Sequence, residues 1–266
     1  VNDAGQLIKG KVAGLSIVNS SGDPLEESQI MLRGITSLFS NTAPLVLIDG
    51  VPGSINSVAP QDIESIDVLK DGSAAAIYGT RGTNGVILIT TKRVSGATPM
   101  TVEYNAYMNL QKIARRPDLL DAEDYKRLIN EGVNLIDHGY STDWLDQILV
   151  KNPVSYMNNI SIKGGTEKSD YIATINSRNN KGIFICSGLK QLNGRIDLNH
   201  SMFKDILNIN VGFHGRLREA PSTTSNGRFN SEAYKQAITR NPTDRVVDDD
   251  GNWVNRGIYM YDNPVA

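Results

Sequence analysis

Three glycines ahead of a β-branched apolar stretch are the first residues whose spacing invites a chemical interpretation. Gly79, Gly82 and Gly85 form a G-x-x-G-x-x-G pattern. A dinucleotide loop instead needs G-x-G-x-x-G between a strand and a long helix, whose amino terminus holds the phosphate. Here a short helical stretch comes first and a strand follows, and no Gly-Lys-Ser/Thr triplet completes a P-loop. The spacing therefore favours turn chemistry over phosphate binding.

An acidic run near the carboxyl end offers oxygen ligands of the kind that calcium binds. Asp248, Asp249 and Asp250 are followed by Asn252. The spacing of an EF-hand is absent, and Asp-Gly between the apolar stretches "RVV" and "WV" is a strong hairpin signal. We therefore expect a β-hairpin here rather than a calcium site.

The remaining nucleophilic and metal-ligating residues form no recognisable set. His138, His200 and His214 lie far apart and match no zinc-ligand spacing, and Cys186 is the only cysteine. No Ser-His-Asp or paired-carboxylate arrangement stands out. We expect a protein that is not an enzyme and has no metal site and no cofactor.

Composition sets wide limits on the class of protein. The 266-residue chain has 39% hydrophobic residues, 21% charged residues and a formal net charge of −2, as expected for a folded chain of two modest domains. Its dispersed basic residues give no surface for nucleic acid, so we expect no such partner. No run of about 18 apolar residues predicts a transmembrane helix, although the alternating strands of a transmembrane β-barrel leave no such signal.

The elements that position these residues fall into two halves. Residues 1–93 contain short strands in "SQIMLRG" and "PLVLIDG", a helical turn opened by Pro60, and a buried strand in "GVILITTKR". Asp62 and Glu64 are placed in the first turn of that helical segment, and Gly79 supplies a left-handed helix stop. This half is predicted to be an α+β domain, joined by a linker at residues 94–100 to the second half, residues 101–266.

Five strands of the second half alternate strictly between apolar and polar residues. One strand sets Tyr156, Ile160 and Ile162 against Ser155, Asn159, Ser161 and Lys163, and later ones set apolar rows against Thr174, Asn176, Asn193 and Arg195. A soluble antiparallel sheet with one wet face has this pattern, and so does a membrane barrel with an outward apolar face and a polar lumen. Short turns such as "GGTEK" and "HSMFKD" alternate with long connections, one of which holds an amphipathic helix in "DAEDYKRLINEG", as in outer-membrane barrels.

Several blocks carry a resemblance to a known family. "QIMLRG", "PLVLIDGVP" and "IESIDVLKDGSAAAIYGTRGTNGVILITTK" resemble the plug domain of TonB-dependent outer-membrane receptors, in the version found in the SusC/RagA family of Bacteroidetes nutrient importers. Downstream, "TDWLDQIL" and "NISIKGGTEKSDYIATINSRNNKGI" resemble the first barrel strands and extracellular loops of that family. The resemblance implies an α+β plug domain followed by antiparallel strands of an incomplete transmembrane β-barrel. Because such barrels have about 22 strands and the chain begins at Val1, we expect a piece of a longer chain.

The resemblance also implies a function and partners. The plug closes the barrel of an outer-membrane importer for oligosaccharide or peptide, a SusD-like surface lipoprotein delivers the ligand, and TonB acts through an N-terminal segment that this sequence does not contain. The complete barrel sits in outer-membrane lipid. Apical plug loops are expected to bind ligand through Thr36, Ser37, Phe39, Asn41, Ser54 and Asn56, and the plug to contact the barrel through Glu64, Lys70, Asp71, Arg81 and Lys92. A siderophore or cobalamin receptor, a soluble α/β protein using the glycine-rich turn, and an adhesive β-domain are the alternatives.

Overall fold

The computed structural model describes residues 4–18, 28–32, 43–70, 76–94, 96–185, 187–220, 229–255 and 263–265. They form two compact units. The first comprises Val1–Asn109, Ser155–Asn180 and Leu189–Ala220, and the second comprises Leu110–Val154, Lys181–Gly188 and Pro221–Ala266. The first unit thus combines the amino-terminal half with the long strands, and the second contains two connections between those strands and the residues that follow the last of them.

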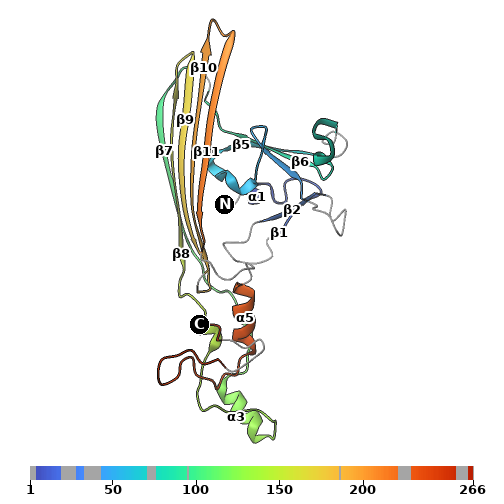
Figure 1. The fold of residues 1–266 in the computed structure, drawn as a ribbon, viewed down its shortest axis with the longest axis vertical. Helices are drawn as coiled ribbons and strands as arrows, with labels where there is room; N and C mark the ends of the chain where they lie inside the picture. Colours follow the sequence, from blue (N-terminus) through green and yellow to red (C-terminus); the bar gives the residue numbers. More distant parts are fainter. Residues whose placement is uncertain are drawn as a thin grey trace. The chain divides into compact units, whose positions relative to one another are not determined.

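Two small sheets build the amino-terminal half, whose described residues between 4 and 94 are called the plug region below (Figure 1). In the first sheet β1 pairs with β2 in antiparallel fashion, and in the second the strand order is β4-β3-β6-β5, with β3 and β6 parallel. The elements are α1 (Ala4–Ile8), β1 (Leu15–Val18), β2 (Gln29–Leu32), β3 (Leu45–Ile48), β4 (Val51–Pro52), η1 (Ile55–Ser57), η2 (Pro60–Asp62), β5 (Ile63–Leu69), η3 (Gly79–Gly82) and β6 (Val86–Thr91).

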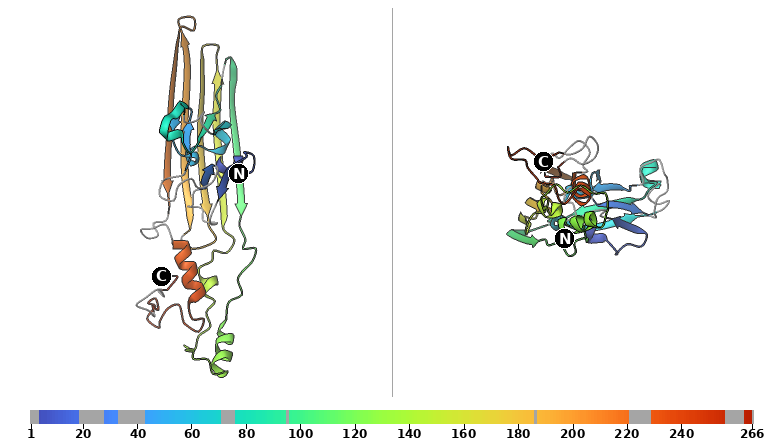
Figure 2. Two further views of the ribbon diagram at one scale, coloured as in Figure 1. Left: turned by 90° about the vertical axis from the view of Figure 1, so that its right-hand side faces the viewer. Right: turned by 90° about the horizontal axis from the view of Figure 1, so that it is seen from below.

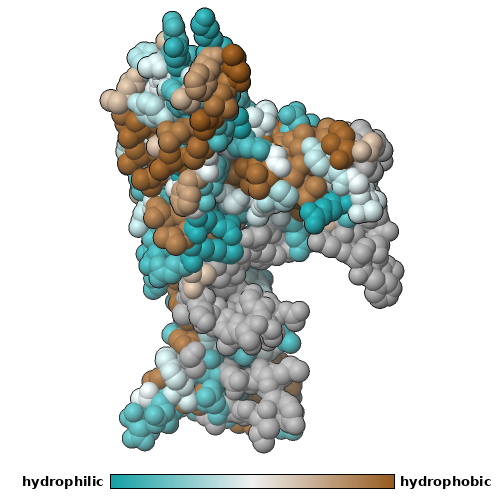
Figure 3. Space-filling model, turned by 45° about the horizontal axis from the view of Figure 1, so that its top comes forward, coloured by the Kyte–Doolittle hydropathy of each residue, from teal (hydrophilic) through white to brown (hydrophobic). Residues whose placement is uncertain are grey.

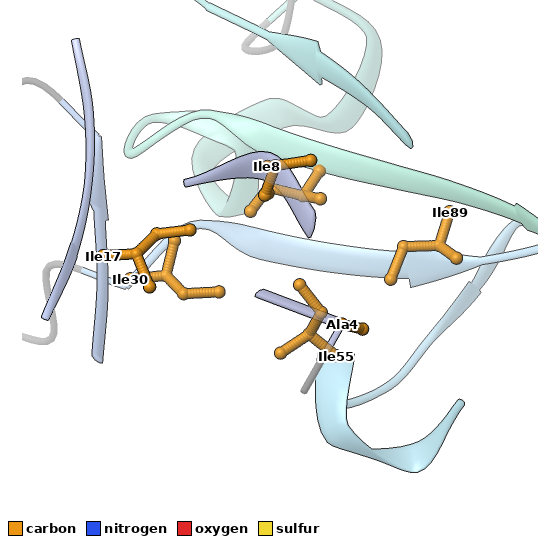
Figure 4. Close-up of a cluster of buried hydrophobic side chains, with 7 residues drawn as sticks. Ala4, Ile8, Ile17, Ile30, Ile55 and Ile89 are labelled. Carbon is orange, nitrogen blue, oxygen red and sulfur yellow. The ribbon is translucent and has the colours of Figure 1, made fainter. Parts of the chain in front are cut away.

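The core of the plug region is built from isoleucines (Figure 4). Strand β6 lies between β3 and β5, and its Ile87 and Ile89 are buried. Ile8 from α1, Ile17 from β1, Ile30 from β2 and Ile55 from η1 belong to the same cluster. Because full burial of one such side chain contributes about 1.5–3 kcal/mol, this cluster holds both small sheets and α1 together. The prediction that "GVILITTKR" forms a buried strand is confirmed.

Local backbone signals act largely as expected. Pro60 opens η2 at its first position, and Gly79 and Gly85 have φ angles of +62° and +87°. The glycine run is therefore a turn. Gly79 does not end the helical structure as predicted, because the 3-10 helix η3 begins at Gly79 and continues to Gly82. The placement of Glu64 in the first helical turn is wrong, because η2 ends at Asp62 and Glu64 lies in β5, where the register with β6 shifts between Ile63 and Ser65.

The five long strands form one curved sheet, called the wall sheet below (Figure 1). Its order, β11-β10-β9-β8-β7, follows the chain, and β8 with β9 and β10 with β11 pair in antiparallel register. The predicted short turns at residues 166–168 and 203–206 are confirmed. The strands are β7 (Thr98–Leu110), β8 (Val154–Gly165), β9 (Ser169–Lys181), β10 (Gly188–Met202) and β11 (Leu207–Glu219).

Strand β7 begins earlier than the sequence predicts. Thr98, Pro99 and Met100, which the expected linker includes, already belong to the strand. Gly164 and Gly165 of the neighbouring β8 explain the extension, because a Cβ at Gly164 would lie 3.2 Å from the Cα of Met100. The absence of side chains on β8 lets the start of β7 approach closely enough to pair.

The two faces of the wall sheet are the reverse of those of a soluble sheet. In β8, β9 and β10 most of the polar row faces the plug region and is buried, and most of the apolar row is exposed (Figure 3). Ile175 and Ile196, for example, are 57% and 47% exposed, while Asn176 and Arg195 are 1% and 5% exposed. The buried polar residues are Ser155, Asn159, Ser161, Thr174, Asn176, Gln191, Asn193 and Arg195.

The described residues of the second unit form three short helices and a hairpin. A capping box formed by Asp121 and Asp124 starts α3 (Ala122–Asn130), and α4 (Trp144–Gln147) packs near α5 (Phe229–Thr239) around the buried Trp144 and Ile148. The predicted hairpin is confirmed by the antiparallel bridge between Val247 and Trp253. Within the described residues, no helix is long and apolar enough to cross a bilayer.

Candidate functional site

The plug region lies on one face of the wall sheet (Figure 2), and polar contacts at Asp62 and Lys92 join the two. Thr174 of β9 donates a hydrogen bond from Oγ1 to Oδ2 of Asp62 over 3.1 Å. Arg195 of β10 donates from Nη2 to the carbonyl oxygen of Lys92 over 2.9 Å. These two points of the plug region are themselves joined, because the Lys92 N–H donates to the Asp62 carbonyl over 2.8 Å. The wall sheet therefore supplies two side chains to this contact, and the plug region supplies the Asp62 carboxylate and the Lys92 carbonyl oxygen.

A third polar contact lies further along β10. Gln191 donates from Nε2 to the carbonyl oxygen of Asn56 over 3.4 Å, and the same nitrogen lies 2.9 Å from Oδ1 of Asn193. Met157 of β8, a buried apolar residue in the row of Ser155 and Asn159, meets the Gln61 amide at 3.8 Å. The described hydrogen bonds between the plug region and the wall sheet thus come from Thr174, Gln191 and Arg195, beside at least one apolar side chain.

The charges at this contact are deeply buried. Asp62 is 6% exposed, and burial raises the pKa of its carboxyl group. The hydrogen bond from Thr174 and the positive charges of Arg195, Lys92 and His214 oppose that rise in pKa. Burial of a carboxylate disfavours its charged form, and neighbouring donors and cations favour it, so the burial effect is the larger one here.

A cavity of about 550 Å³ lies beside these charges. Residues 49, 51–53 and 57–59 line it from the plug region, and polar residues of β10 and β11 line it from the wall sheet. Its wall side includes Asn193, Arg195, Asp197, Asn210 and His214. Such a mixture of donors, acceptors and charges suits a hydrated space or a polar solute.

The comparisons with known proteins bear directly on this arrangement. A sequence model described as the TonB-dependent receptor plug domain matches residues 1–86. The TonB-dependent receptor SusC of Bacteroides thetaiotaomicron is 35% identical over 242 residues, which cover 85% of this chain and 24% of SusC. The chain belongs to the TonB-dependent receptors.

Two further proteins extend the match over almost the whole chain. The TonB-dependent receptor P3 of Formosa agariphila is 34% identical over 279 residues, covering 99% of this chain and 27% of P3. The structure of the RagAB peptide importer in its open-open state matches with a TM-score of 0.76 at 22% identity, covering 99% of this chain and 34% of that chain. The chain therefore spans about a quarter of the length of these curated relatives. A plug domain followed by antiparallel strands of a barrel, the predicted fold class, is confirmed.

In this TonB-dependent receptor, the described residues of the predicted ligand set are Ser54 and Asn56. Ser54 caps η1 by accepting the Asn56 N–H at its hydroxyl over 3.3 Å, and Asn56 meets the wall sheet through its carbonyl oxygen. Their neighbours Gly53 and Ser57 line the cavity. Thr36, Ser37, Phe39 and Asn41 lie outside the described residues. Ligand binding by these residues stays a prediction.

The predicted plug contacts have different positions from one another. Lys92 touches the wall sheet through its carbonyl oxygen, and the Lys70 ammonium group donates to the carbonyl of Ala13 within the plug region over 2.5 Å. Glu64 and Arg81 are exposed, and Asp71 lies outside the described residues, as does Cys186. Contacts of these side chains with a complete barrel stay predictions.

The sequence pattern alone does not single out these contact residues as a site. It places Asp62 in a helical turn and assigns Thr174 and Arg195 to the polar faces of their strands. A signal did exist, because an arginine and a threonine in a polar row opposite lipid-type apolar residues need partners on the inner side. The identity of that partner depends on the tertiary fold.

The acidic run in the second unit has turn-type contacts. The Asp248 carboxylate accepts the backbone N–H groups of Asp250 and Asn252 over 3.0 and 2.8 Å. The hydrogen bond from the Asn252 backbone is the main reason why the pKa of this exposed carboxyl group lies below its usual value. Arg245 pairs with Asp249 over 2.7 Å. These bonds stabilise the hairpin that the Asp-Gly pair predicts.

Proposed function

We propose that the complete receptor containing this chain imports oligosaccharide or peptide across the outer membrane. In this proposal the plug region closes the barrel from inside, and a SusD-like surface lipoprotein delivers the solute from outside. TonB, acting on a segment ahead of the plug domain, supplies the force that displaces it. Residues of the apical loops, including Ser54 and Asn56, contact the solute.

One observation carries this proposal. The central strands β8, β9 and β10 bury most of their polar row under the plug region and leave apolar residues, including Ile160, Ile175 and Ile196, exposed. A water-soluble sheet does the opposite, because apolar burial is the main driving force for folding. An apolar outer face and a polar inner face are the arrangement of a sheet whose solvent is lipid.

The alternatives explain less of the molecule. A soluble α/β protein and an adhesive β-domain both require the apolar row of the wall sheet to be packed inward, and it is exposed. A siderophore or cobalamin receptor has the same requirements for fold and membrane as the favoured function. SusC and P3 match 85% and 99% of this chain in sequence, whereas the ferric enterobactin receptor PirA matches 35% of it, which supports a SusC-type importer over a siderophore receptor.

Uptake measurements separate the substrate classes. A strain that lacks the complete receptor is complemented with the intact gene, and uptake of labelled oligosaccharides, labelled peptides and a ferric siderophore is compared with and without TonB. We expect TonB-dependent uptake of an oligosaccharide or a peptide. Uptake of the siderophore alone would contradict the substrate assignment.

Localisation and partnership are tested in the same strains. We expect the receptor to fractionate with the outer membrane, to need detergent for a monodisperse solution, and to co-purify with a lipoprotein encoded beside it. A receptor that stays monodisperse without detergent would contradict the barrel itself. Co-purification with no lipoprotein would contradict the proposed delivery step.

A further inference from the structure

The Arg195 side chain contacts the plug region while it is also paired with a carboxylate on its own strand. Its Nε forms an ion pair with Oδ2 of Asp197, two residues along the same face of β10. This pairing leaves Nη2 to donate to the Lys92 carbonyl oxygen over 2.9 Å. The Arg195 side chain is 5% exposed, and that of Asp197 is 13% exposed. One side of the guanidinium group is thus held by the wall sheet and the other side by the plug region.

The neighbouring strand makes room for this pair. Asp197 lies opposite Gly212 in the register of β10 and β11, and a Cβ at Gly212 would lie only 2.8 Å from Oδ1 of Asp197. Gly212 has no positive φ angle that would itself require glycine. The lack of a side chain at this position therefore serves the Asp197 carboxylate. His214, next but one on β11, has its Nε2 3.5 Å from the same oxygen.

We propose that Arg195, Asp197 and Gly212 form a preset docking point on the wall sheet that sets the position of the plug region at Lys92 and Asp62. Asp197 is the positioning residue, because it orients Arg195 without touching the plug region in any contact described above. Gly212 is the element that permits that orientation. The use of this docking point in gating rests on the proposed function, but its effect on plug docking does not.

The physical reason for such an arrangement is preorganisation. A guanidinium group with no partner loses several rotamer degrees of freedom each time it docks, whereas one already paired on its own strand does not. When the plug region leaves, Arg195 keeps its carboxylate partner and gains water, so that no buried charge is left without a partner. The same geometry is then available when the plug region returns.

The test compares two glycine-to-alanine substitutions in the complete receptor. Gly212→Ala places its Cβ 2.8 Å from Oδ1 of Asp197 and so displaces the carboxylate that pairs with Arg195, whereas Gly194→Ala, on β10 beside Arg195, places its Cβ where no atom lies within 4 Å. Arg195→Gln removes the docking group itself. Hydrogen–deuterium exchange is followed in peptides covering residues 55–62 and 90–94, with residues 45–48 of β3 as the internal reference.

Loss of a charge-assisted hydrogen bond predicts exchange at least roughly tenfold faster in residues 55–62 and 90–94 of Gly212→Ala and Arg195→Gln. We expect Gly194→Ala to match the wild type and residues 45–48 to be unchanged in all variants. Equal exchange in Gly212→Ala and Gly194→Ala would overturn the proposal. So would acceleration of residues 45–48 to the same extent, because that pattern indicates general destabilisation of the plug region.

Uptake is measured separately on the same variants. If the wild-type receptor imports none of the solutes tested, the proposed function fails and the exchange data still decide the docking point. If the wild type imports a solute and exchange is the same in all variants, the docking point fails and the proposed function stands. The two outcomes are therefore distinguishable.

Discussion

Alanine at Gly85 is expected to destabilise the plug region more than alanine at Gly79, although both glycines belong to the same G-x-x-G-x-x-G run. Gly85 has a φ angle of +87°, and an added Cβ would collide with a methyl group of Leu32 and lie 3.2 Å from the carbonyl oxygen of Leu69. Gly79 has a φ angle of +62°, and nothing lies within 4 Å of an added Cβ. Comparing the two variants therefore separates the free-energy cost of a positive φ angle, which both share, from the cost of steric overlap, which only Gly85→Ala has.

The expected magnitudes follow from these two terms. A left-handed conformation costs a residue with a Cβ roughly 1–2 kcal/mol, which applies to both variants. Overpacking against Leu32 and the backbone of Leu69 adds about 1–3 kcal/mol in Gly85→Ala alone. The total of roughly 2–5 kcal/mol is a large part of the 5–15 kcal/mol that stabilises a typical domain.

Pulse proteolysis of the complete receptor across a urea series measures this difference. We expect the midpoint for cleavage within the plug region to fall by about 1 M urea or more in Gly85→Ala, and by clearly less in Gly79→Ala. Cleavage within the second unit serves as the control and is expected to be unchanged. Equal shifts in the two variants would refute the steric argument, and no shift in either would refute the turn assignment altogether.

Three further predictions concern the other parts of the chain. Asp121→Ala removes the capping box of α3 and is expected to cost about 1 kcal/mol, seen as faster amide exchange in that helix only. Ile196→Lys places a charge on the exposed apolar face and is expected to lower the stability of the complete receptor in lipid vesicles by roughly 2–4 kcal/mol, whereas Ile196→Leu is expected to have little effect. Burial raises the pKa of the Asp62 carboxyl group in the docked plug region, so that docking favours its protonated form. The stabilisation of docking by this group is therefore fully present below its ordinary pKa and is lost as the pH rises through the raised pKa. Amide exchange at residues 55–62 is expected to become faster over that rise in pH, and Asp62→Asn is expected to remove this dependence.

The strand faces of the wall sheet were predictable because their signal is local. Alternation of Ser155, Asn159 and Ser161 with Tyr156 and Ile160 assigns each side chain to a face without any knowledge of the fold. Pro60 and Gly79 likewise act on their own backbone. Each of these predictions needs information from only a few neighbouring residues.

The contacts across the plug region and the wall sheet were not predictable in the same way. Asp62 and Thr174 are 112 positions apart, and Lys92 and Arg195 are 103 apart. No local pattern pairs one polar side chain with another over such a separation, and the inner face offers many equivalent candidates. The early start of β7 has a similar origin, because it depends on glycines in β8 that are distant in the sequence.

Which face of the wall sheet is turned toward the plug region also determines how readily the plug region can be removed. If apolar residues stood in place of Thr174, Gln191 and Arg195, every Å² of apolar surface that the plug region uncovered on leaving would cost about 25 cal/mol, and closure would be harder to reverse. Thr174, Gln191 and Arg195 instead make hydrogen bonds, and water replaces these at a net cost of only about 0.5–3 kcal/mol each. A shift of one residue in the register of β10 would turn Arg195 outward and Ile196 toward the plug region. Such a shift would put a charge on the apolar face and would make the contact of β10 with the plug region hydrophobic. The register of β10 therefore determines both which residues are exposed and how readily the plug region can leave.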